Sequence, residues 1–161
     1  MNPCPCGYAG HLQDRCLCTQ EQIQRYRGKI SGPLLDRMDM HVEVTRQSSE
    51  LLSDTVSPSA ETSLIVRERV LRARKIQEQR QGKCNSLLTI PELDEACVLE
   101  TNAQQLLHQV MSKFDLSARV YHRIVKVART VADLEGCESI LERHISEVLN
   151  YRCLDRKQGY N

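Results

Sequence analysis

Only one stretch of this 161-residue chain alternates apolar and polar residues in the manner of a β-strand, the segment MDMHVEV at 38–44. A single strand can neither bury itself nor pair its own edges. The sequence therefore predicts a mainly α fold in which the part that carries the strand is not self-sufficient. The composition agrees, because one Phe and no Trp leave the core to Leu, Ile, Val and Ala, which suit helices.

Helix start and stop signals divide the rest of the chain. Thr19–Gln22 and Thr101–Gln104 each fit a capping box, in which a Thr hydroxyl and a Gln side chain satisfy backbone amides at a helix start. Gly82 and Gly136 are expected to end helices. Residues 83–99 are expected to be less regular. Helices are predicted over five segments: 20–30, 62–81, 102–114, 118–134 and 141–151.

Two of the predicted helices carry a basic face. In 62–81 one face is expected to carry Ile65, Val66, Val70, Ala73 and Ile76, and the other face holds Arg67, Arg69, Arg72, Arg74, Lys75 and Arg80. In 118–134 the apolar stripe is opposed by Arg119, His122, Arg123, Lys126 and Arg129. Such faces are usually solvated, so contact with nucleic acid or an acidic partner is the more specific and less favoured interpretation.

Composition changes along the chain predict three parts. Residues 1–48 form a Cys-rich piece that ends in the strand. Residues 49–61 are polar and rich in Ser and Thr, which is typical of a linker. Residues 62–156 are expected to form a bundle of roughly four helices.

Four cysteines open the chain in two Cys-x-Cys pairs: Cys4, Cys6, Cys16 and Cys18. Four thiolates from two short segments can surround Zn²⁺ tetrahedrally, and a metal would replace the core that so short a segment cannot build. The commoner pair is Cys-x-x-Cys, so reduced thiols without a metal, or redox-active thiols, remain the alternative. His11 is a less favoured substitute ligand, and the other four cysteines are expected to be packing thiols.

Arg37 lies in SGPLLDRMD, between a predicted helix end and the strand. An Arg held on rigid elements can reach a phosphate. An ion pair with Asp36 or Asp39 is the alternative, and spacing alone favours the ion pair.

Several functional classes lack support in the sequence. The net charge is +1, so no global field indicates nucleic acid or membrane. No apolar run is long enough for a transmembrane helix and no signal-peptide pattern occurs, so a cytoplasmic chain with reduced thiols is expected. No G-x-x-x-x-G-K-[ST] motif, no Walker B-like strand and no Ser-His-Asp or H-E-x-x-H pattern is present.

Four motifs in this order resemble one family. NPCPCGY, C-x-C-T-x-E-Q-I-x-R-Y-R, ISGPLLDRMDMHVEV and LSARVYHRIVKVARTVADLEG are similar to the C-terminal third of the Mg-chelatase-like AAA+ ATPases of the ComM/YifB type. The resemblance covers nearly the whole chain, from Asn2 to about Arg156. It implies that 1–48 is the C-terminal piece of an AAA+ α/β core and that 62–156 is its helical lid.

The resemblance also implies roles for three residues. Asn2 matches the sensor 1 residue, which orients the attacking water near the γ-phosphate. Arg37 matches the arginine finger, which acts on a neighbouring subunit's nucleotide, and Arg119 matches the sensor 2 arginine. Phosphoryl transfer depends on positive charge fixed around the transferring group, which planar, permanently charged Arg supplies.

The implied function is a homo-hexameric, ATP- and Mg²⁺-dependent motor that threads or branch-migrates DNA in natural transformation and recombination, without porphyrin chemistry. Met1 matches an internal methionine of the family. The chain is therefore expected to be the remainder of a longer protein, through a shortened gene, a start assigned at an internal methionine, or excision. Without a P-loop, the chain alone is expected not to hydrolyse ATP.

Two other hypotheses remain open at this stage. One is a free-standing zinc-dependent module that binds nucleic acid or protein, for which salt-sensitive DNA binding and zinc-dependent folding are expected. The other is a non-functional remnant, for which poor expression and a fragile N-terminal segment are expected.

Overall fold

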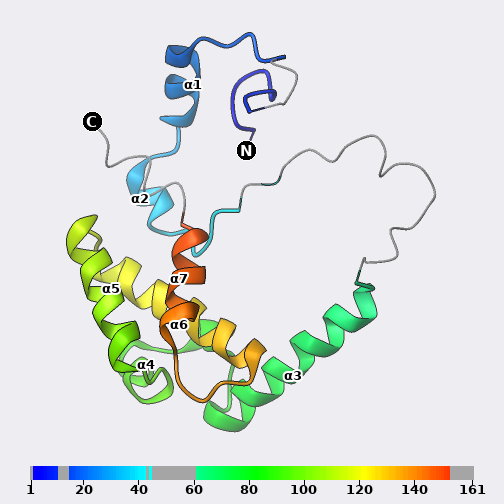
Figure 1. Cartoon of the computed structure of the whole chain (residues 1–161), viewed down its shortest axis with the longest axis vertical. Coiled ribbons are helices and arrows are strands. Elements are labelled where there is room, and N and C mark those ends of the chain that lie inside the picture. Colours follow the sequence, from blue (N-terminus) through cyan, green and yellow to red (C-terminus); the bar gives the residue numbers. More distant parts are fainter. Residues whose placement is uncertain (1, 11–14, 43, 45–60, 153–161) are drawn as a thin grey trace. The chain divides into compact units, whose positions relative to one another are not determined.

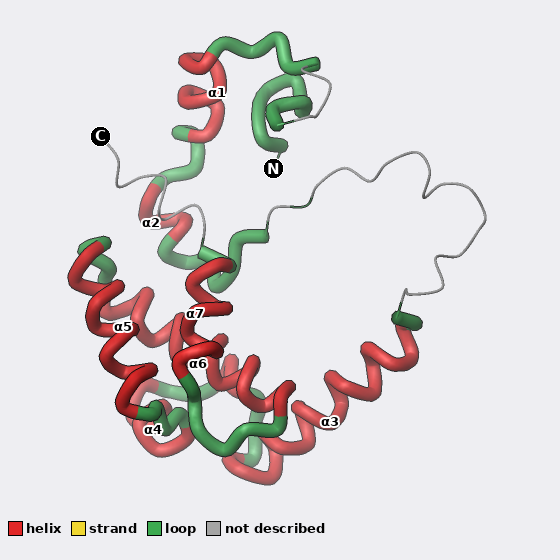
Figure 2. The backbone as a smooth tube through the Cα atoms, viewed as in Figure 1, coloured by secondary structure: helices red, strands yellow, loops and turns green. Residues whose placement is uncertain are grey.

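The computed structural model describes residues 2–10, 15–42, 44 and 61–152, and these fall into two compact units. The first unit contains the described residues up to Met38, together with residue 44. The second contains Asp39–Val42 and the described residues from 61 onward. Helices and loops make up the described part of both units, as the colouring in Figure 2 shows, so the fold is mainly α as predicted.

The first unit holds two short helices. Helix α1 (Gln20–Arg27) begins at the predicted capping box, in which the amide of Gln22 donates to the Thr19 hydroxyl and the amide of Thr19 donates to the Gln22 side chain. Helix α2 (Gly32–Leu35) has a proline in its first turn, where the missing N–H costs nothing. Arg27 Nε donates to the carbonyl of Pro3 at 3.1 Å and so ties α1 to the Cys-rich loop.

The predicted strand at 38–44 is reduced to a single bridge. Among the described residues of this segment, only His41 is bridged, in parallel, to Arg152, and its amide donates to the carbonyl of Tyr151 at 2.5 Å. A strand needs an extended partner along its length. The described partner here is Arg152, just beyond the C-terminal end of α7.

The second unit is a helical bundle (Figure 1). Its elements are α3 (Ser63–Gln81), the 3₁₀ turn η2 (Asn85–Leu87), α4 (Ile90–Ala96), α5 (Thr101–Lys113), α6 (Ala118–Glu135) and α7 (Glu142–Asn150). Helix α6 is central, because it contacts α3, η2, α4 and α7, while α5 packs on α7. No helix in the described residues is long and apolar enough to span a membrane.

The core of the bundle is one cluster of sixteen buried residues from the described part of the chain. The predicted apolar stripe of α6 lies in it, with Val120, Ile124 and Ala128 essentially inaccessible to solvent. Full burial of a Val, Leu or Ile side chain contributes about 1.5–3 kcal/mol. A bridge between Leu99 and Ile140 joins the loops that precede α5 and α7.

The helix ends agree with the sequence at some positions and differ at others. Gly82 and Gly136 end α3 and α6 with φ of 70° and 75°, in the left-handed region that glycine adopts without strain. The predicted box at Thr101–Gln104 is wrong, because Glu100 is the N-cap of α5 and makes no side-chain cap bond. A box that the sequence analysis missed, Thr89 with Glu92, starts α4.

Two predicted faces are also wrong. The sequence predicts an apolar face on α3 opposite a basic one, yet Ala73 is the only apolar residue of this helix that is buried, together with Gln77. In α6, Arg129 was placed on the solvated stripe, yet its side chain is inaccessible to solvent. Both differences follow from neighbours that periodicity does not identify.

Candidate functional site

The four N-terminal cysteines converge on one point of the first unit. The Sγ atom of Cys4 lies 3.3 Å from that of Cys6 and 3.7 Å from that of Cys16, and Cys6 and Cys16 are also 3.7 Å apart. The Cys18 sulfur completes a group whose atoms all lie within 4.8 Å of one another. With Zn–S bonds of about 2.3 Å, the sulfurs of a tetrahedral site are about 3.8 Å apart, so the four thiols suit Zn²⁺.

A tight turn holds the first Cys pair. The amide of Gly7 donates to the carbonyl of Cys4 at 3.0 Å, and Gly7 has φ of 82°, which favours glycine at this position. The next turn directs the amide of Ala9 at the Cys4 sulfur, 3.3 Å away. An N–H directed at sulfur stabilises a thiolate, which is the form that binds metal.

The thiols of the cluster differ in acidity. Burial opposes ionisation of Cys4, but bonds from the Cys6 thiol and the Ala9 amide outweigh it and lower the pKa of Cys4 to about 6. A backbone bond from Cys6 favours the Cys18 thiolate, but the Cys6 thiol, burial and the Cys4 charge raise the pKa of Cys18 to about 12. The four sulfurs therefore ionise together only when a cation compensates their charge.

Two of the residues that the resemblance singles out lie in the first unit. Asn2 is exposed beside the cysteine turn, and its Nδ2 would lie 3.6 Å from a Cβ placed on Gly7. Arg37 follows α2, is exposed, and donates from Nη1 to the carbonyl of Pro33 at 3.4 Å. It forms no ion pair with Asp36 within this unit. His11, the substitute ligand, lies outside the described residues, as does Cys153.

Arg119, the third residue singled out, lies in the second unit. It occupies the first turn of α6 and is exposed, two residues after the N-cap Ser117, whose hydroxyl accepts from the amide of Val120. One turn further along α6, Arg123 forms an ion pair with Asp39. The basic stripe of α6 is therefore partly paired, and its exposed part begins at Arg119.

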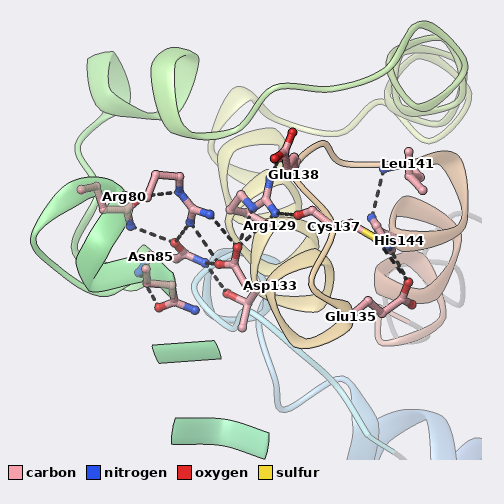
Figure 3. A network of polar contacts seen from close by, with 12 residues as sticks. Arg80, Asn85, Arg129, Asp133, Glu135, Cys137, Glu138, Leu141 and His144 are labelled. Atoms are coloured by element: carbon pink, nitrogen blue, oxygen red, sulfur yellow. Dashed lines mark hydrogen bonds and ion pairs between the residues drawn. The ribbon is translucent and has the colours of Figure 1, made fainter. Parts of the chain in front are cut away.

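A buried charge network that the sequence analysis missed is centred on Asp133 of α6 (Figure 3). Arg80 Nη1 and Nη2 donate to its two carboxylate oxygens at 2.6 and 3.0 Å, and Arg129 Nε donates at 3.1 Å. Asn85 adds a bond of 2.8 Å. Burial opposes the charge of Asp133, but the bonds from Arg80 and Asn85 and the charge of Arg129 lower its pKa. This network joins α3, η2 and α6, so its role is to stabilise the packing of these three elements.

The sequence signal for this network is the spacing of Arg129 and Asp133, which lie four residues apart on one helix and can therefore pair. Arg129 also donates from Nη1 to the carbonyl of Glu138 at 2.5 Å, and to the carbonyl of Cys137. Its guanidinium thus supplies hydrogen-bond donors to two backbone carbonyls of the loop after Gly136. A sequence pattern cannot show which carbonyls a loop leaves for a side chain to bind.

A second group with metal-ligand chemistry lies at the junction of α6 and α7, where Glu135, Cys137 and His144 gather. The Nδ1 atom of His144 accepts from the amide of Leu141 at 3.0 Å, so the proton of the neutral ring is on Nε2, which lies 3.0 Å from Glu135. Arg143 also binds Glu135, at 2.9 Å through Nε. Bonds from His144 and Arg143 lower the pKa of Glu135. The possible metal-ligand atoms here are already hydrogen-bonded to groups of the protein. We call this group the latch, because its hydrogen bonds join the end of α6 to the start of α7.

Comparison with known proteins finds two family descriptions, both of the magnesium chelatase ChlI subunit. The chain matches "Magnesium chelatase, subunit ChlI" over residues 1–52 and "Magnesium chelatase, subunit ChlI C-terminal" over residues 60–152. The first match ends at residue 52 and the second begins at residue 60, and both ends lie in the segment that the structure does not describe.

Similar curated proteins extend beyond this chain. The Haemophilus influenzae protein named competence protein ComM is 41% identical over 156 residues, which are 97% of this chain and 30% of the relative. The uncharacterized protein YifB of Escherichia coli K12 is 40% identical over the same shares. An uncharacterized Mycobacterium bovis protein is 34% identical over 94% of this chain and 30% of its own length. The chain therefore spans just under a third of the length of these relatives.

Proposed function

This chain belongs to the ComM/YifB type of the magnesium chelatase-like family, and we propose that it supplies the phosphate-facing residues Asn2, Arg37 and Arg119 of an ATP-hydrolysing DNA motor. The observation that supports this most is the match to both family descriptions, one over each unit. In addition, one amide side chain and two arginines occupy these three positions, and such side chains can orient water and neutralise phosphate charge in phosphoryl transfer.

Arg37 is the proposed arginine finger. It lies just beyond the C-cap of the short helix α2, it is exposed, and it forms no ion pair with Asp36, so that carboxylate does not neutralise its charge. A finger of this kind neutralises charge on the transferring phosphoryl group and is worth about 10³–10⁵ in kcat in other nucleotide hydrolases. Because a finger acts between subunits, this role includes a homo-hexamer as the working assembly.

Asn2 and Arg119 have narrower proposed roles. A side-chain amide at Asn2 can orient a water by hydrogen bonds, and Arg119 at the start of α6 can place a second fixed positive charge at the phosphates. Each lies exposed in its own unit.

Bound ATP and Mg²⁺ fit this chain only in part. The three proposed residues suit phosphate oxygens and an attacking water, but the sequence holds no P-loop to surround the β- and γ-phosphates and no Walker B-like acids for Mg²⁺. When bound, the nucleotide supplies the phosphoryl group that is transferred. The chain's own residues orient water and neutralise charge, and the P-loop comes from another polypeptide segment.

Zn²⁺ at Cys4, Cys6, Cys16 and Cys18 has a structural role in this proposal. The sulfur spacing and the amide directed at Cys4 support it. A closed set of four thiolates leaves no position for substrate, so the metal would fix the loop that carries Asn2 rather than take part in hydrolysis.

DNA is the proposed substrate of the whole motor, and natural transformation its proposed setting, because one relative is named a competence protein. A chimera tests the nucleotide roles. The matched 30% of the Haemophilus protein is replaced by this chain, and DNA-stimulated hydrolysis of Mg-ATP is measured. Arg37→Ala should lower kcat by at least about 10³-fold while nucleotide binding persists. Arg25→Ala, an exposed arginine of α1 in the same unit, is the matched control.

Mixing sharpens this test. A chimera with Arg37→Ala and one with a disabled P-loop should regain part of the activity when mixed, since the finger of one subunit serves its neighbour. Full activity of the Arg37→Ala chimera, or Arg37-dependent hydrolysis by the isolated chain, would refute the proposal.

A zinc-dependent nucleic-acid module is a second candidate, favoured by the convergence of the four sulfurs alone. It requires the isolated, zinc-loaded chain to bind duplex DNA with an affinity that falls steeply with salt and is lost on chelation. Fluorescence anisotropy with a labelled duplex, at several salt concentrations, separates this candidate from the motor role.

A further inference from the structure

The bundle holds a short piece of the chain that precedes it. Asp39–Val42 belongs to the second unit, whereas Arg37, two residues earlier, belongs to the first. The amide of His41 donates to the carbonyl of Tyr151 at 2.5 Å, and His41 forms a parallel bridge with Arg152. Both bridged residues are buried. The segment is therefore packed on the bundle, just beyond the C-terminal end of α7.

Asp39 opens this segment and gives it a charged contact with α6. Its carboxylate accepts from Nη1 of Arg123 in an ion pair, and its carbonyl oxygen lies 3.5 Å from Nη1 of Arg152. The Asp39 side chain is 62% exposed and that of Arg123 is 25% exposed. An ion pair with this exposure contributes little to the free energy of unfolding. Its place in the chain is therefore more informative than its strength.

Asp39 lies close in the chain to one proposed phosphate-facing residue. Arg37 is two residues before it, and two residues of fully extended chain span at most about 7 Å. Asp36, the acid nearer to Arg37, forms no ion pair with a described residue. The contact with Arg123 therefore restrains the backbone beside Arg37 without neutralising the Arg37 guanidinium.

Arg123 lies close to another proposed phosphate-facing residue. It is one turn after Arg119 on α6, and residues four apart share one face of a helix. Lys126, on the same face, donates from Nζ to the carbonyl of Ser86 at 3.4 Å. Arg119 is exposed and forms no ion pair with a described residue. Arg123 and Lys126 therefore contact the protein itself, whereas the charge of Arg119 remains for an anion.

We propose that Asp39 and Arg123 are positioning residues of the nucleotide site, and that their ion pair fixes the backbone after Arg37 to the turn of α6 that follows Arg119. This inference rests on the proposed function, in which both of these arginines act on phosphate. Phosphoryl transfer depends on positive charge held in place, and a misplacement of about 1 Å can cost about 100-fold in rate. A contact that adds little stability can therefore have a large effect on hydrolysis.

A double-mutant cycle in the chimera described above tests the pair, with kcat and KM for Mg-ATP as the readouts. Asp39→Asn and Arg123→Gln should each lower kcat by about 10- to 100-fold, which is less than Arg37→Ala, and should leave KM nearly unchanged. The double variant should be no slower than the slower single variant, because either change alone breaks the pair. Arg123→Lys keeps the charge and should retain most of the kcat.

Glu92→Gln is the matched control. It removes another partly exposed ion pair of the bundle, that with Lys83, and should leave kcat unchanged. A second measurement uses the isolated full chain without nucleotide. Asp39→Asn should increase the exchange rate of the His41 amide several-fold by NMR, because the segment is held less firmly, whereas Glu92→Gln should not.

The outcomes separate this inference from the proposed function. If Arg37→Ala abolishes hydrolysis but Asp39→Asn has wild-type kcat, the positioning role is wrong and the proposed function stands. Additive losses from Asp39→Asn and Arg123→Gln also overturn the inference, because Arg123 then acts without Asp39. Unchanged exchange of the His41 amide shows that the pair does not hold the segment. Full activity of the Arg37→Ala chimera overturns both proposals.

Discussion

The two units of this chain differ in how much they bury. Within the described residues of the first unit, Cys4 and Leu35 are the buried apolar side chains, and α1 buries none of its residues. The described part of the second unit assembles sixteen buried apolar residues into one core, with a buried charge network beside it. One unit can therefore fold on hydrophobic burial, and the other needs a different source of stability.

The difference indicates that a metal held by four sulfurs could take the place of a hydrophobic core in the first unit. Short segments that lack a core are commonly held by a structural metal, and binding of Zn²⁺ to four thiolates then becomes folding free energy. The folding of the first unit should therefore depend on zinc. The resistance of the second unit to denaturant should depend on core packing and on the Asp133 network.

Loss of a sulfur ligand should have the largest effect. Cys16→Ser should weaken zinc binding by at least about 100-fold, because one of four thiolates is gone, and should remove hydrogen-exchange protection from residues 2–38 but not from the bundle. Zinc content and amide exchange by mass spectrometry measure both. Cys84→Ser, outside the cluster, should leave both unchanged. Absence of zinc from the native protein would remove the basis for the comparison.

Removal of the buried anion should come next. Asp133→Asn leaves the inaccessible guanidinium of Arg129 without its counter-charge and should destabilise the bundle by about 3–5 kcal/mol. Denaturant-induced unfolding measures it, with Asp94→Asn at an exposed site as control. The double change Asp133→Leu with Arg129→Met should cost less than the sum of the two single changes, since the inaccessible guanidinium of Arg129 is removed together with its counter-charge. Additive costs would show that the network is not a coupled unit.

The latch at the α6–α7 junction should matter less. His144→Leu removes both the acceptor for the Leu141 amide and the partner of Glu135, and should cost about 1–3 kcal/mol. His144→Gln keeps an acceptor at the N3 position of α7 and should recover part of that loss. Thermal unfolding distinguishes them, and zinc content should not change in either variant. A drop in bound zinc would show that this group is a metal site after all.

The smallest effect should be a dependence on pH within the bundle. Bonds from Lys83 and from the amide and hydroxyl of Thr89 lower the pKa of Glu92 from 4.5 to about 2. A carboxylate with a lowered pKa stabilises the fold above its unfolded pKa, and this contribution is lost as the pH falls towards 2. Wild-type stability should therefore fall more steeply between pH 5 and pH 2.5 than that of Glu92→Gln.

Unfolding midpoints at a series of pH values give the two slopes of the Glu92 comparison. Glu142→Gln, in the first turn of α7, is the matched control and should follow the wild type. Parallel curves for the wild type and Glu92→Gln would show that the Lys83 contact contributes no net stability.

The sequence by itself determined the helical class, most helix ends and the grouping of the four N-terminal cysteines, because these depend on residues close together in the chain. A capping Thr, a glycine that tolerates positive φ and an apolar stripe act locally, as at Thr19, Gly136 and Val120. The family resemblance, too, was carried by short contiguous motifs, and the match over both units confirmed it.

Only the tertiary structure decided which helix faces have partners. Arg129 is buried because Asp133, Arg80 and two loop carbonyls surround it, and those groups come from up to about 50 residues away in the chain. The first half of α3 carries apolar side chains that are exposed, because the buried residues of this helix begin only at Ala73. Among the described residues of 38–44 only one bridge forms, because the pairing of a strand depends on what lies beside it and alternation alone supplies no partner.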